Sequence, residues 1–272
     1  AASRPDIPFI AIQITGFARF ELLEKVHRGD TLTAAETQEY TRVRNRIFAI
    51  AEAGAVHNVA ILVDAEESWI QNPVDALAGE MMSLFNKGKV VVYNTFQMYC
   101  HDRFSFLQTS LEKAVKDNYL LGAKLVRGAY MEKENKRAAE NDYPTPIQPD
   151  KAATDKDYDA AVKLCLDHID QLAVFIGTHN EKSCMLAALM LDEKGMPHNH
   201  PHVNFSQLLG MSDNITFNLA HAGYNVSKYL PYGPVKKVMP YLLRRAQENT
   251  SIAGQMGREL TLIRKEMKRR GI

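Results

Sequence analysis

The chain has 272 residues, of which 46% are hydrophobic and 24% charged, enough apolar material for one large globular domain. Its formal net charge of +1 argues against a nucleic-acid-binding protein. The three cysteines are far apart and form no CxxC pair, which argues for a reducing compartment and against a disulfide framework or a zinc site. No apolar run approaches the roughly 20 residues of a transmembrane helix, and no signal peptide is visible.

Short apolar runs alternate with longer segments of helical periodicity. The predicted strands are residues 9–14, 59–63, 90–93, 124–126, 172–176, 203–208 and 226–230. The predicted helices include residues 34–53, 74–85, 104–120, 152–166 and 181–194. Most of the strands are rich in Val, Ile, Phe or Tyr, as buried parallel strands are. The alternation predicts an α/β fold with a parallel sheet, and the length suits a (βα)8 TIM-type barrel of roughly 250 residues.

A closed barrel of this type has eight strands, but the sequence indicates seven. Two explanations stay open: the first strand would precede Ala1, or one strand within the chain goes unrecognised. We predict a single domain over residues 1–272, in which a proline-rich surface loop covers residues 141–149. A helix is expected at about 234–249, and a basic C-terminal helix at 254–272.

Polar residues follow every predicted strand, at the end where barrel enzymes hold their active sites. The polar strand ends are Gln13 and Thr15, residues 64–67, 94–97, 127–130 and 178–180, Gln207 with Leu208, and Tyr229. Any one of them can serve as a helix cap or turn. Seven on one rim indicate a mouth that binds a ligand.

The predicted helix at 234–249 carries Tyr241, Arg244, Arg245 and Glu248 at positions i, i+3, i+4 and i+7. At 3.6 residues per turn these side chains share one face. One interpretation is a solvated charged face. The other is a carboxylate site, because adjacent guanidinium groups can each bind a carboxylate through two hydrogen bonds.

At these residues the chain resembles the proline dehydrogenase family. Residues 241–249 (YLLRRAQEN) resemble its substrate-binding signature, and residues 124–130 (KLVRGAY) resemble its flavin-binding strand. Further blocks follow in family order at 63–67 (VDAEE), 178–180 (THN), 207–211 (QLLGM) and 229–233 (YLPYG), so the resemblance spans about residues 9–251. It implies a distorted (βα)8 barrel whose last helix lies over the strand ends.

The resemblance also implies FAD, bound without a dinucleotide fingerprint, and the sequence contains no GxGxxG after a strand. The implied reaction converts L-proline to Δ1-pyrroline-5-carboxylate by hydride transfer from C5 to flavin N5, the first step of proline catabolism. Electrons then pass to a membrane quinone. The implied location is the cytoplasmic face of a bacterial inner membrane, or the mitochondrion in a eukaryote.

The resemblance assigns roles residue by residue. Arg244 and Arg245 would clamp the proline carboxylate, Tyr241 and Leu208 would pack against the pyrrolidine ring, and Tyr229 would close the pocket near the ring carbons. Asp64 would hold the arginine and tyrosine side chains in place. Glu248 would reach the cofactor ribose or orient Arg245. The remaining predicted cofactor residues are Gln97, Lys124, Val126, Arg127, Gly128, Ala129, Tyr130, Thr178, His179 and Asn180.

One position departs from the family pattern. The family commonly has Lys at the end of the strand matching residues 9–15, where it aids carboxylate binding, and Gln13 stands there in this chain. Glutamine donates a hydrogen bond but brings no charge. We therefore expect weaker substrate binding, by about 1–2 kcal/mol.

Other interpretations stay open. A hydroxyproline dehydrogenase of the same family is one, although Tyr229 leaves little room for a 4-hydroxyl group. A metal-dependent barrel hydrolase using Asp64, Glu66 and His179 is another, and a barrel without activity is a third. The cluster His198-Asn-His-Pro-His202 lacks a clear fourth ligand, so no metal site is predicted. The basic C-terminal helix suits peripheral contact with an anionic membrane or a solvated end of the chain.

Overall fold

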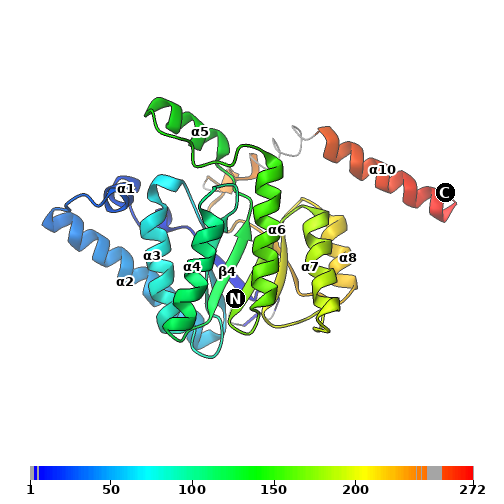
Figure 1. Ribbon diagram of the computed structural model, residues 1–272, viewed down its shortest axis with the longest axis horizontal. Helices are drawn as coiled ribbons and strands as arrows, with labels where there is room; N and C mark the ends of the chain where they lie inside the picture. Colours follow the sequence, from blue (N-terminus) through cyan, green and yellow to red (C-terminus); the bar gives the residue numbers. More distant parts are fainter. Residues whose placement is uncertain (1–2, 5, 237, 240, 244–252, 272) are drawn as a thin grey trace.

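The computed structural model describes residues 3–4, 6–236, 238–239, 241–243 and 253–271. Within this part of the chain, strands and helices alternate (Figure 1). The strands are β1 (Phe9–Ile12), β2 (Ala60–Val63), β3 (Val92–Gln97), β4 (Leu121–Val126), β5 (Leu172–Gly177), β6 (Val203–Leu208) and β7 (Val226–Tyr229). The helices are α1 (Phe20–Arg28), α2 (Ala34–His57), α3 (Ser68–Phe85), α4 (Arg103–Lys116), α5 (Met131–Glu140), α6 (Lys151–Asp167), α7 (Glu181–Glu193), α8 (Asp213–His221) and α10 (Ala253–Arg270). A short 3-10 helix, η1 (Ile14–Gly16), follows β1.

All seven strands of the described chain form one parallel sheet in the order β1-β2-β3-β4-β5-β6-β7. Each strand therefore pairs with the strands that precede and follow it along the chain, and β1 and β7 are the two edges. Because the strands are parallel and in sequence order, their carboxyl ends all lie at one end of the sheet. The predicted parallel α/β arrangement is confirmed.

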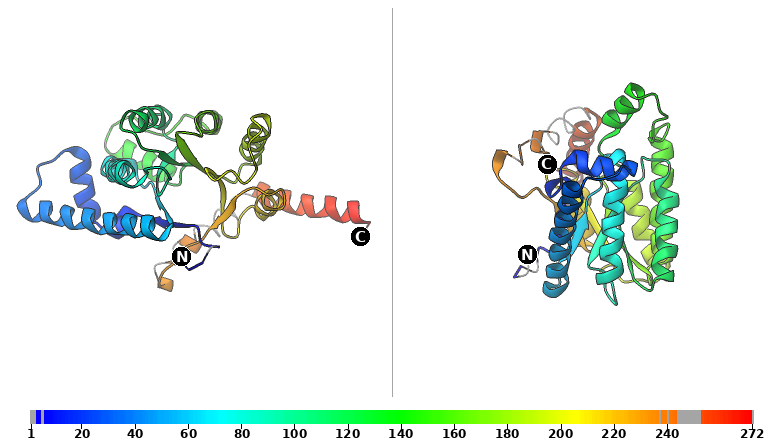
Figure 2. Two further views of the ribbon diagram at one scale, coloured as in Figure 1. Left: turned by 90° about the horizontal axis from the view of Figure 1, so that it is seen from below. Right: turned by 90° about the vertical axis from the view of Figure 1, so that its left-hand side faces the viewer.

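The sheet is strongly curled. The Phe9 ring on β1 meets the Phe175 ring on β5 edge to face, with centroids 5.0 Å apart. A flat sheet would separate these strands by four spacings, roughly 19 Å. At the other end, Tyr229 on β7 hydrogen-bonds to Asp64 after β2, across a flat distance of five spacings, roughly 24 Å. The sheet therefore bends into most of a barrel, as the end-on view shows (Figure 2).

Side chains alternate between the two faces of this curled sheet. Phe9, Leu62, Tyr93 and Phe175 belong to a small apolar cluster on the concave face. The intervening residues face outward and pack with the helices in the large core, which contains Ile61, Phe96, Leu125, Ile176 and Phe205. The helices lie on the convex side (Figure 2), so the concave face is left to line the barrel interior.

Three helices lie outside the helical segments named from the sequence, namely α1, α5 and α8. Several predicted bounds were also wrong. Residues 94–97 lie within β3 rather than after it, and β4 begins at Leu121 rather than at 124. The predicted loop at 141–149 is confirmed as a largely exposed segment without helix, tied down where Ile147 bridges to Cys100.

The last part of the chain is described in pieces. Residues 235–236, 238–239 and 241–243 are helical, in agreement with the start of the helix predicted at 234–249. Helix α10 extends away from the sheet and its surrounding helices (Figure 1). No helix within the described residues combines the length and the apolar character that a membrane span needs.

Candidate functional site

Three predicted site residues from distant strands meet on the concave face at the carboxyl end of the sheet. Lys124 Nζ on β4 donates to Asp64 Oδ1 at 2.5 Å, and the Tyr229 hydroxyl donates to Asp64 Oδ2 at 2.7 Å. The Lys124 ammonium also lies 5.1 Å from the centroid of the Tyr229 ring. We call Asp64, Lys124 and Tyr229 the inner cluster. Asp64 was predicted to hold arginine and tyrosine side chains: it accepts from Tyr229, the two arginines lie outside the described residues, and its bond to Lys124 was not foreseen.

The inner cluster is largely closed to solvent, with side-chain exposures of 8% for Lys124 and 12% for Asp64. Burial, followed by the neighbouring Asp64 carboxylate, raises the pKa of Tyr229 above its ordinary value. The phenol therefore stays protonated and acts as a donor to Asp64. Removing one partner of such a buried ion pair leaves an uncompensated charge, which typically costs about 3–5 kcal/mol.

Strand alternation places further predicted residues on the same concave face. Gln13 has an extended backbone (φ −105°, ψ 131°), so its side chain points to the same face as those of Phe9 and Ala11. It is exposed at the rim. Val126 lies two residues after Lys124 on β4, so its side chain points to the same concave face. By the same alternation, Leu208 at the end of β6 also points to the concave face. Gln97 is buried, and its Nε2 donates to the backbone oxygen of Glu66 at 2.8 Å.

A second cluster lies on the convex side of the same rim. The guanidinium group of Arg127 donates to Asp155 Oδ1 at 2.7 Å, to Thr178 Oγ1 at 2.7 Å and to Ser183 Oγ at 3.0 Å. It also stacks 4.2 Å above the ring of Tyr158. We call Arg127 and these four partners the outer cluster. Asp155, Tyr158 and Ser183 were not predicted as site residues, because no local pattern marks them as neighbours of Arg127.

The loop between β4 and α5 contains three predicted cofactor residues, Gly128, Ala129 and Tyr130. Gly128 has a φ of +139°, and a Cβ there would lie 2.4 Å from the Tyr99 ring. Glycine is therefore required for both backbone conformation and space. Tyr130 is the N-cap residue of α5.

The residues after β5 form the start of α7. Asn180 caps the helix, because its side-chain oxygen accepts from the backbone N–H groups of Lys182 and Ser183. His179 Nδ1 lies 3.1 Å from Ser212 Oγ at the start of α8. Ser212 was not predicted as part of the site. Its left-handed φ of +53° could not be foreseen from the sequence.

The predicted carboxylate clamp lies outside the described residues, since Arg244, Arg245 and Glu248 fall in the segment 244–252. Tyr241, from the same predicted face, is described. Its ring centroid lies 6.3 Å from that of Tyr229. The described start of this helix is therefore next to the inner cluster, at the carboxyl end of β7.

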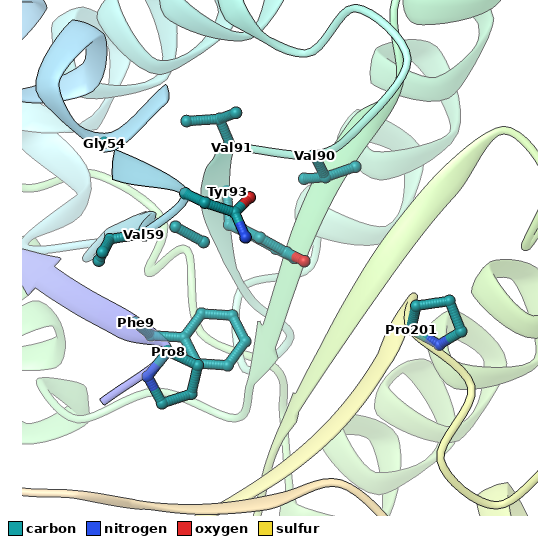
Figure 3. A pocket seen from close by; sticks show the side chains of 10 residues that line it. Pro8, Phe9, Gly54, Val59, Val90, Val91, Tyr93 and Pro201 are labelled. Atoms are coloured by element: carbon teal, nitrogen blue, oxygen red, sulfur yellow. The ribbon is translucent and has the colours of Figure 1, made fainter. Parts of the chain in front are cut away.

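The opposite end of the sheet carries a different kind of hollow. It has a volume of about 150 Å³ and is lined by Pro8, Phe9, Val59, Tyr93 and Pro201, among others (Figure 3). These residues lie at or before the amino ends of their strands. The lining offers no cationic side chain for a carboxylate or a diphosphate, whereas Lys124 and Arg127 lie at the carboxyl end of β4.

Metal ligands do not gather within the described part of the chain: no three His, Cys, Asp or Glu side chains are grouped so that they could hold an ion. In the histidine cluster, His198 pairs with Asp192 at 2.8 Å, and His202 Nδ1 lies 2.9 Å from the backbone oxygen of Ile169. The hydrolase interpretation required Asp64, Glu66 and His179 to share a metal. Instead, Asp64 binds Lys124 and Tyr229, and Glu66 binds Thr15.

The rim has the donor groups that FAD requires. Lys124 on β4 provides a positive charge on the concave face, and Gln97 and His179 lie at the ends of β3 and β5, the two strands that flank β4. Arg127 uses three of its five N–H donors in the outer cluster, so two can still serve an anionic diphosphate. The residues present therefore fit a flavin dinucleotide.

A curled parallel α/β sheet, with helices on its convex side and charged side chains at its carboxyl ends, is the arrangement of (βα)8-type barrels. A model of the proline dehydrogenase family matches residues 7–258. The chain belongs to the proline dehydrogenase family, as its motifs indicate.

Individual relatives and structures agree with this assignment. The chain is 38% identical over 245 residues to mitochondrial proline dehydrogenase 1 of Drosophila melanogaster, covering 86% of this chain and 36% of the relative. It is 39% identical over 239 residues to hydroxyproline dehydrogenase of Xenopus laevis, covering 85% of this chain and 51% of the relative. The chain thus spans between about a third and a half of the length of these relatives.

The fold is also similar to a solved structure, that of proline utilization A from Bdellovibrio bacteriovorus inactivated by N-propargylglycine. The TM-score is 0.78 at 22% identity, and the match covers 89% of this chain and 24% of that one. The likeness shows that the curled sheet and its helices follow the arrangement of that protein.

Proposed function

We propose that this chain is the catalytic barrel of an FAD-dependent enzyme that oxidises L-proline to Δ1-pyrroline-5-carboxylate. The observation that carries the proposal is the inner cluster, in which a lysine, an aspartate and a tyrosine from three distant strands meet at the mouth of the barrel. Membership of the proline dehydrogenase family supports the substrate class. Oxidation removes one proton from the ring nitrogen and a hydride from C5.

The chain's own residues bind and orient the substrate. Arg244 and Arg245 are proposed to bind the proline carboxylate, with Gln13 donating a further hydrogen bond. Tyr241 and Leu208 are proposed to pack on the pyrrolidine ring, and Tyr229 closes the pocket beside the ring carbons. Because Tyr229 is fixed through Asp64, its ring does not have to be ordered when substrate arrives, and this preorganisation favours the reactive geometry.

FAD, when bound, supplies the acceptor for the hydride and its two electrons. Lys124, Gln97, Val126 and His179 are proposed to surround its ring system. Arg127, Gly128, Ala129, Tyr130, Thr178, Asn180 and Glu248 are proposed to contact the rest of the dinucleotide. The positive charge of Lys124 near the ring favours a build-up of negative charge there. The ring nitrogen must lose its proton, and solvent at the exposed rim beside Gln13 is our proposed acceptor.

Electrons are proposed to pass on to a membrane quinone. Helix α10 suits peripheral membrane contact, because Arg264, Lys265, Lys268, Arg269 and Arg270 outnumber its acids, and basic amphipathic helices bind anionic surfaces. Relatives named mitochondrial support a mitochondrial location if the chain is eukaryotic. The cytoplasmic face of the inner membrane is the corresponding proposal for a bacterium.

A hydroxyproline dehydrogenase is the second candidate, favoured by the 39% identity to the Xenopus laevis enzyme of that name. The position of Tyr229 speaks for proline, because its ring is held at the pocket by Asp64 and would crowd a 4-hydroxyl group. The two substrates therefore have to be compared directly.

The test is a steady-state assay of the FAD-loaded chain with a soluble dye as electron acceptor. We expect kcat/KM for L-proline to exceed that for trans-4-hydroxy-L-proline by at least about tenfold, since a clash of one hydroxyl is worth on the order of 1–3 kcal/mol. The reverse preference would establish the second candidate. Turnover of neither compound would contradict the proposal.

A further inference from the structure

The carboxylate of Glu66 is buried beyond the end of β2, and the residue as a whole is 5% exposed. Both of its oxygens accept from one residue: Oε1 from the backbone N–H of Thr15 at 3.1 Å and Oε2 from the Thr15 hydroxyl at 2.5 Å. The neighbouring charges, Asp64 and Glu67, have the same sign as Glu66. Burying a carboxylate among like charges is costly, so this arrangement needs an explanation.

Glu66 is itself held firmly. Its backbone N–H donates to Gln71 Oε1 on α3 at 3.0 Å. Its backbone oxygen accepts from Gln97 Nε2 on β3 at 2.8 Å. The carboxylate therefore projects from a backbone that is fixed by two neighbouring elements, so it can serve as an anchor for the segment that it binds.

The anchored segment is the exit of β1. Thr15 follows Gln13 by two residues within the turn of η1, where the backbone N–H of Gly16 donates to the Gln13 oxygen at 3.0 Å. Strand β1 is an edge of the described sheet and pairs only with β2. The segment that follows β1 therefore has a neighbouring strand on only one side within the described sheet. Beyond the last residue pair of β1 and β2, Ile12 with Val63, the two hydrogen bonds from Thr15 to Glu66 restrain this segment.

We propose that Glu66 is a positioning residue for substrate binding, acting through Thr15 to fix Gln13 at the rim. The inference rests on the proposed function, in which Gln13 donates to the substrate carboxylate. Glu66 itself is not proposed to touch the substrate. A mobile Gln13 would have to be ordered on binding, and that entropy cost weakens affinity.

The test is a double-mutant cycle between Thr15 and Gln13. Thr15→Val removes the hydroxyl bond while keeping the shape of the side chain. We expect it to raise KM for L-proline by up to about tenfold, the entropy cost of ordering one mobile side chain on binding, with kcat changed less than about twofold because uniform binding is lost. Thr15→Ser should restore the wild-type KM. In a Gln13→Ala background, Thr15→Val should have no further effect on KM.

Ser68→Ala is the matched control. Ser68 donates to buried Glu134 through its backbone N–H at 2.7 Å and its hydroxyl at 2.6 Å, the same arrangement at the start of α3. This variant should lower thermal stability about as much as Thr15→Val and leave KM unchanged. An equal rise of KM in Ser68→Ala would show that the KM effect follows from lost stability, and a Thr15→Val effect that persists in the Gln13→Ala background would show that it does not pass through Gln13; either result would overturn the inference.

A binding measurement separates this inference from the proposed function. Cyclopentanecarboxylate has the ring and carboxylate of proline but no nitrogen, so it cannot be converted to an imine. Its Kd, measured by calorimetry on the FAD-loaded chain, should rise by up to about tenfold in Thr15→Val and only in the presence of Gln13. Binding with this pattern but without L-proline turnover would overturn the proposed function and support the inference. Turnover of L-proline without this binding pattern would support the proposed function and overturn the inference. If neither turnover nor the binding pattern is observed, the proposed function and the inference are both wrong.

Discussion

Lys124 and Arg127 stand three residues apart at the end of β4, and each pairs with an aspartate and lies over a tyrosine ring. Lys124 faces the concave side, where its partners Asp64 and Tyr229 come from the ends of β2 and β7. Arg127 faces the convex side, where Asp155 and Tyr158 both come from α6. Two ion pairs of the same kind, each beside a tyrosine ring, thus lie on opposite faces of the sheet.

The inner cluster joins distant strands across the barrel mouth, whereas the outer cluster fastens neighbouring helices to one strand end. Their burial also differs: Lys124 and Asp64 are 8% and 12% exposed, and Arg127 and Asp155 are 20% and 30% exposed. Electrostatic effects are larger where water is excluded. Changes in the inner cluster should therefore affect stability, substrate binding and, through Lys124, the flavin ring. Changes in the outer cluster should affect stability and the binding of the rest of the cofactor.

The largest expected effect is that of Asp64→Ala. It leaves the Lys124 ammonium buried without its carboxylate and removes the acceptor of Tyr229. We expect the free energy of unfolding to fall by about 3–5 kcal/mol, measured by urea denaturation, together with loss of L-proline turnover. Asp155→Ala is the matched control in the more exposed outer cluster, with an expected loss of about 1 kcal/mol. Equal losses would remove the distinction between the clusters.

Arg127→Lys should have an intermediate effect. Lysine keeps the positive charge but lacks the planar group that bonds Asp155, Thr178 and Ser183 together. We expect about 1–2 kcal/mol of lost stability and a higher Kd for FAD in fluorescence titrations, with the KM for L-proline little changed. A large rise in KM with unchanged FAD affinity would place Arg127 in the substrate site instead.

Gln13→Lys tests the exposed side of the concave face. A lysine there would add a charge-assisted bond to the substrate carboxylate, worth about 1–2 kcal/mol over the neutral bond of glutamine. We expect KM for L-proline to fall about tenfold in steady-state assays. Gln13→Met, of similar length but without a donor, should raise KM. If neither variant changes KM, Gln13 does not meet the carboxylate.

The smallest effect concerns pH. Burial raises the pKa of Glu66 above its ordinary value of 4.5, so the folded chain holds this proton more tightly than the unfolded chain. The stabilisation from this proton is complete below pH 4.5 and is lost as the pH rises through the raised value. Glu66→Gln cannot lose a proton, so its stability relative to wild type should increase over that range. Thermal melts of both proteins from pH 4 upwards should reveal this trend, and parallel curves would contradict it.

The sequence predicted the strand order and the polar rim, because short apolar runs between helices leave few alternatives to a parallel sheet. It ended the third strand too early, at residue 93, by taking the polar residues 94–97 as lying beyond the strand rather than within β3. Asn94 and Thr95 are polar but buried, since Asn94 Nδ2 donates to Asp75 and the Thr95 hydroxyl donates to the Val63 oxygen. Such long-range partners leave no local signal.

The same limit explains the missed helix α5, whose sequence MEKENKRAAE has almost no apolar face. It is held from a distance, because Glu134 accepts from Ser68 and Lys133 pairs with Glu67. Within the site, the motifs identified Lys124 and Arg127 together. Strand alternation separates them onto two faces, but their partners Tyr229 and Asp155 were fixed only by the curl of the sheet and the position of α6.

The most direct test of the central claim is the visible absorption spectrum of the purified chain with FAD, recorded without oxygen before and after adding L-proline. The proposed function predicts bound-flavin bands that bleach with L-proline and persist with D-proline, whose ring hydrogens would face differently when its carboxylate is held. Bands that do not bleach with L-proline, or a chain that binds no FAD, would contradict it.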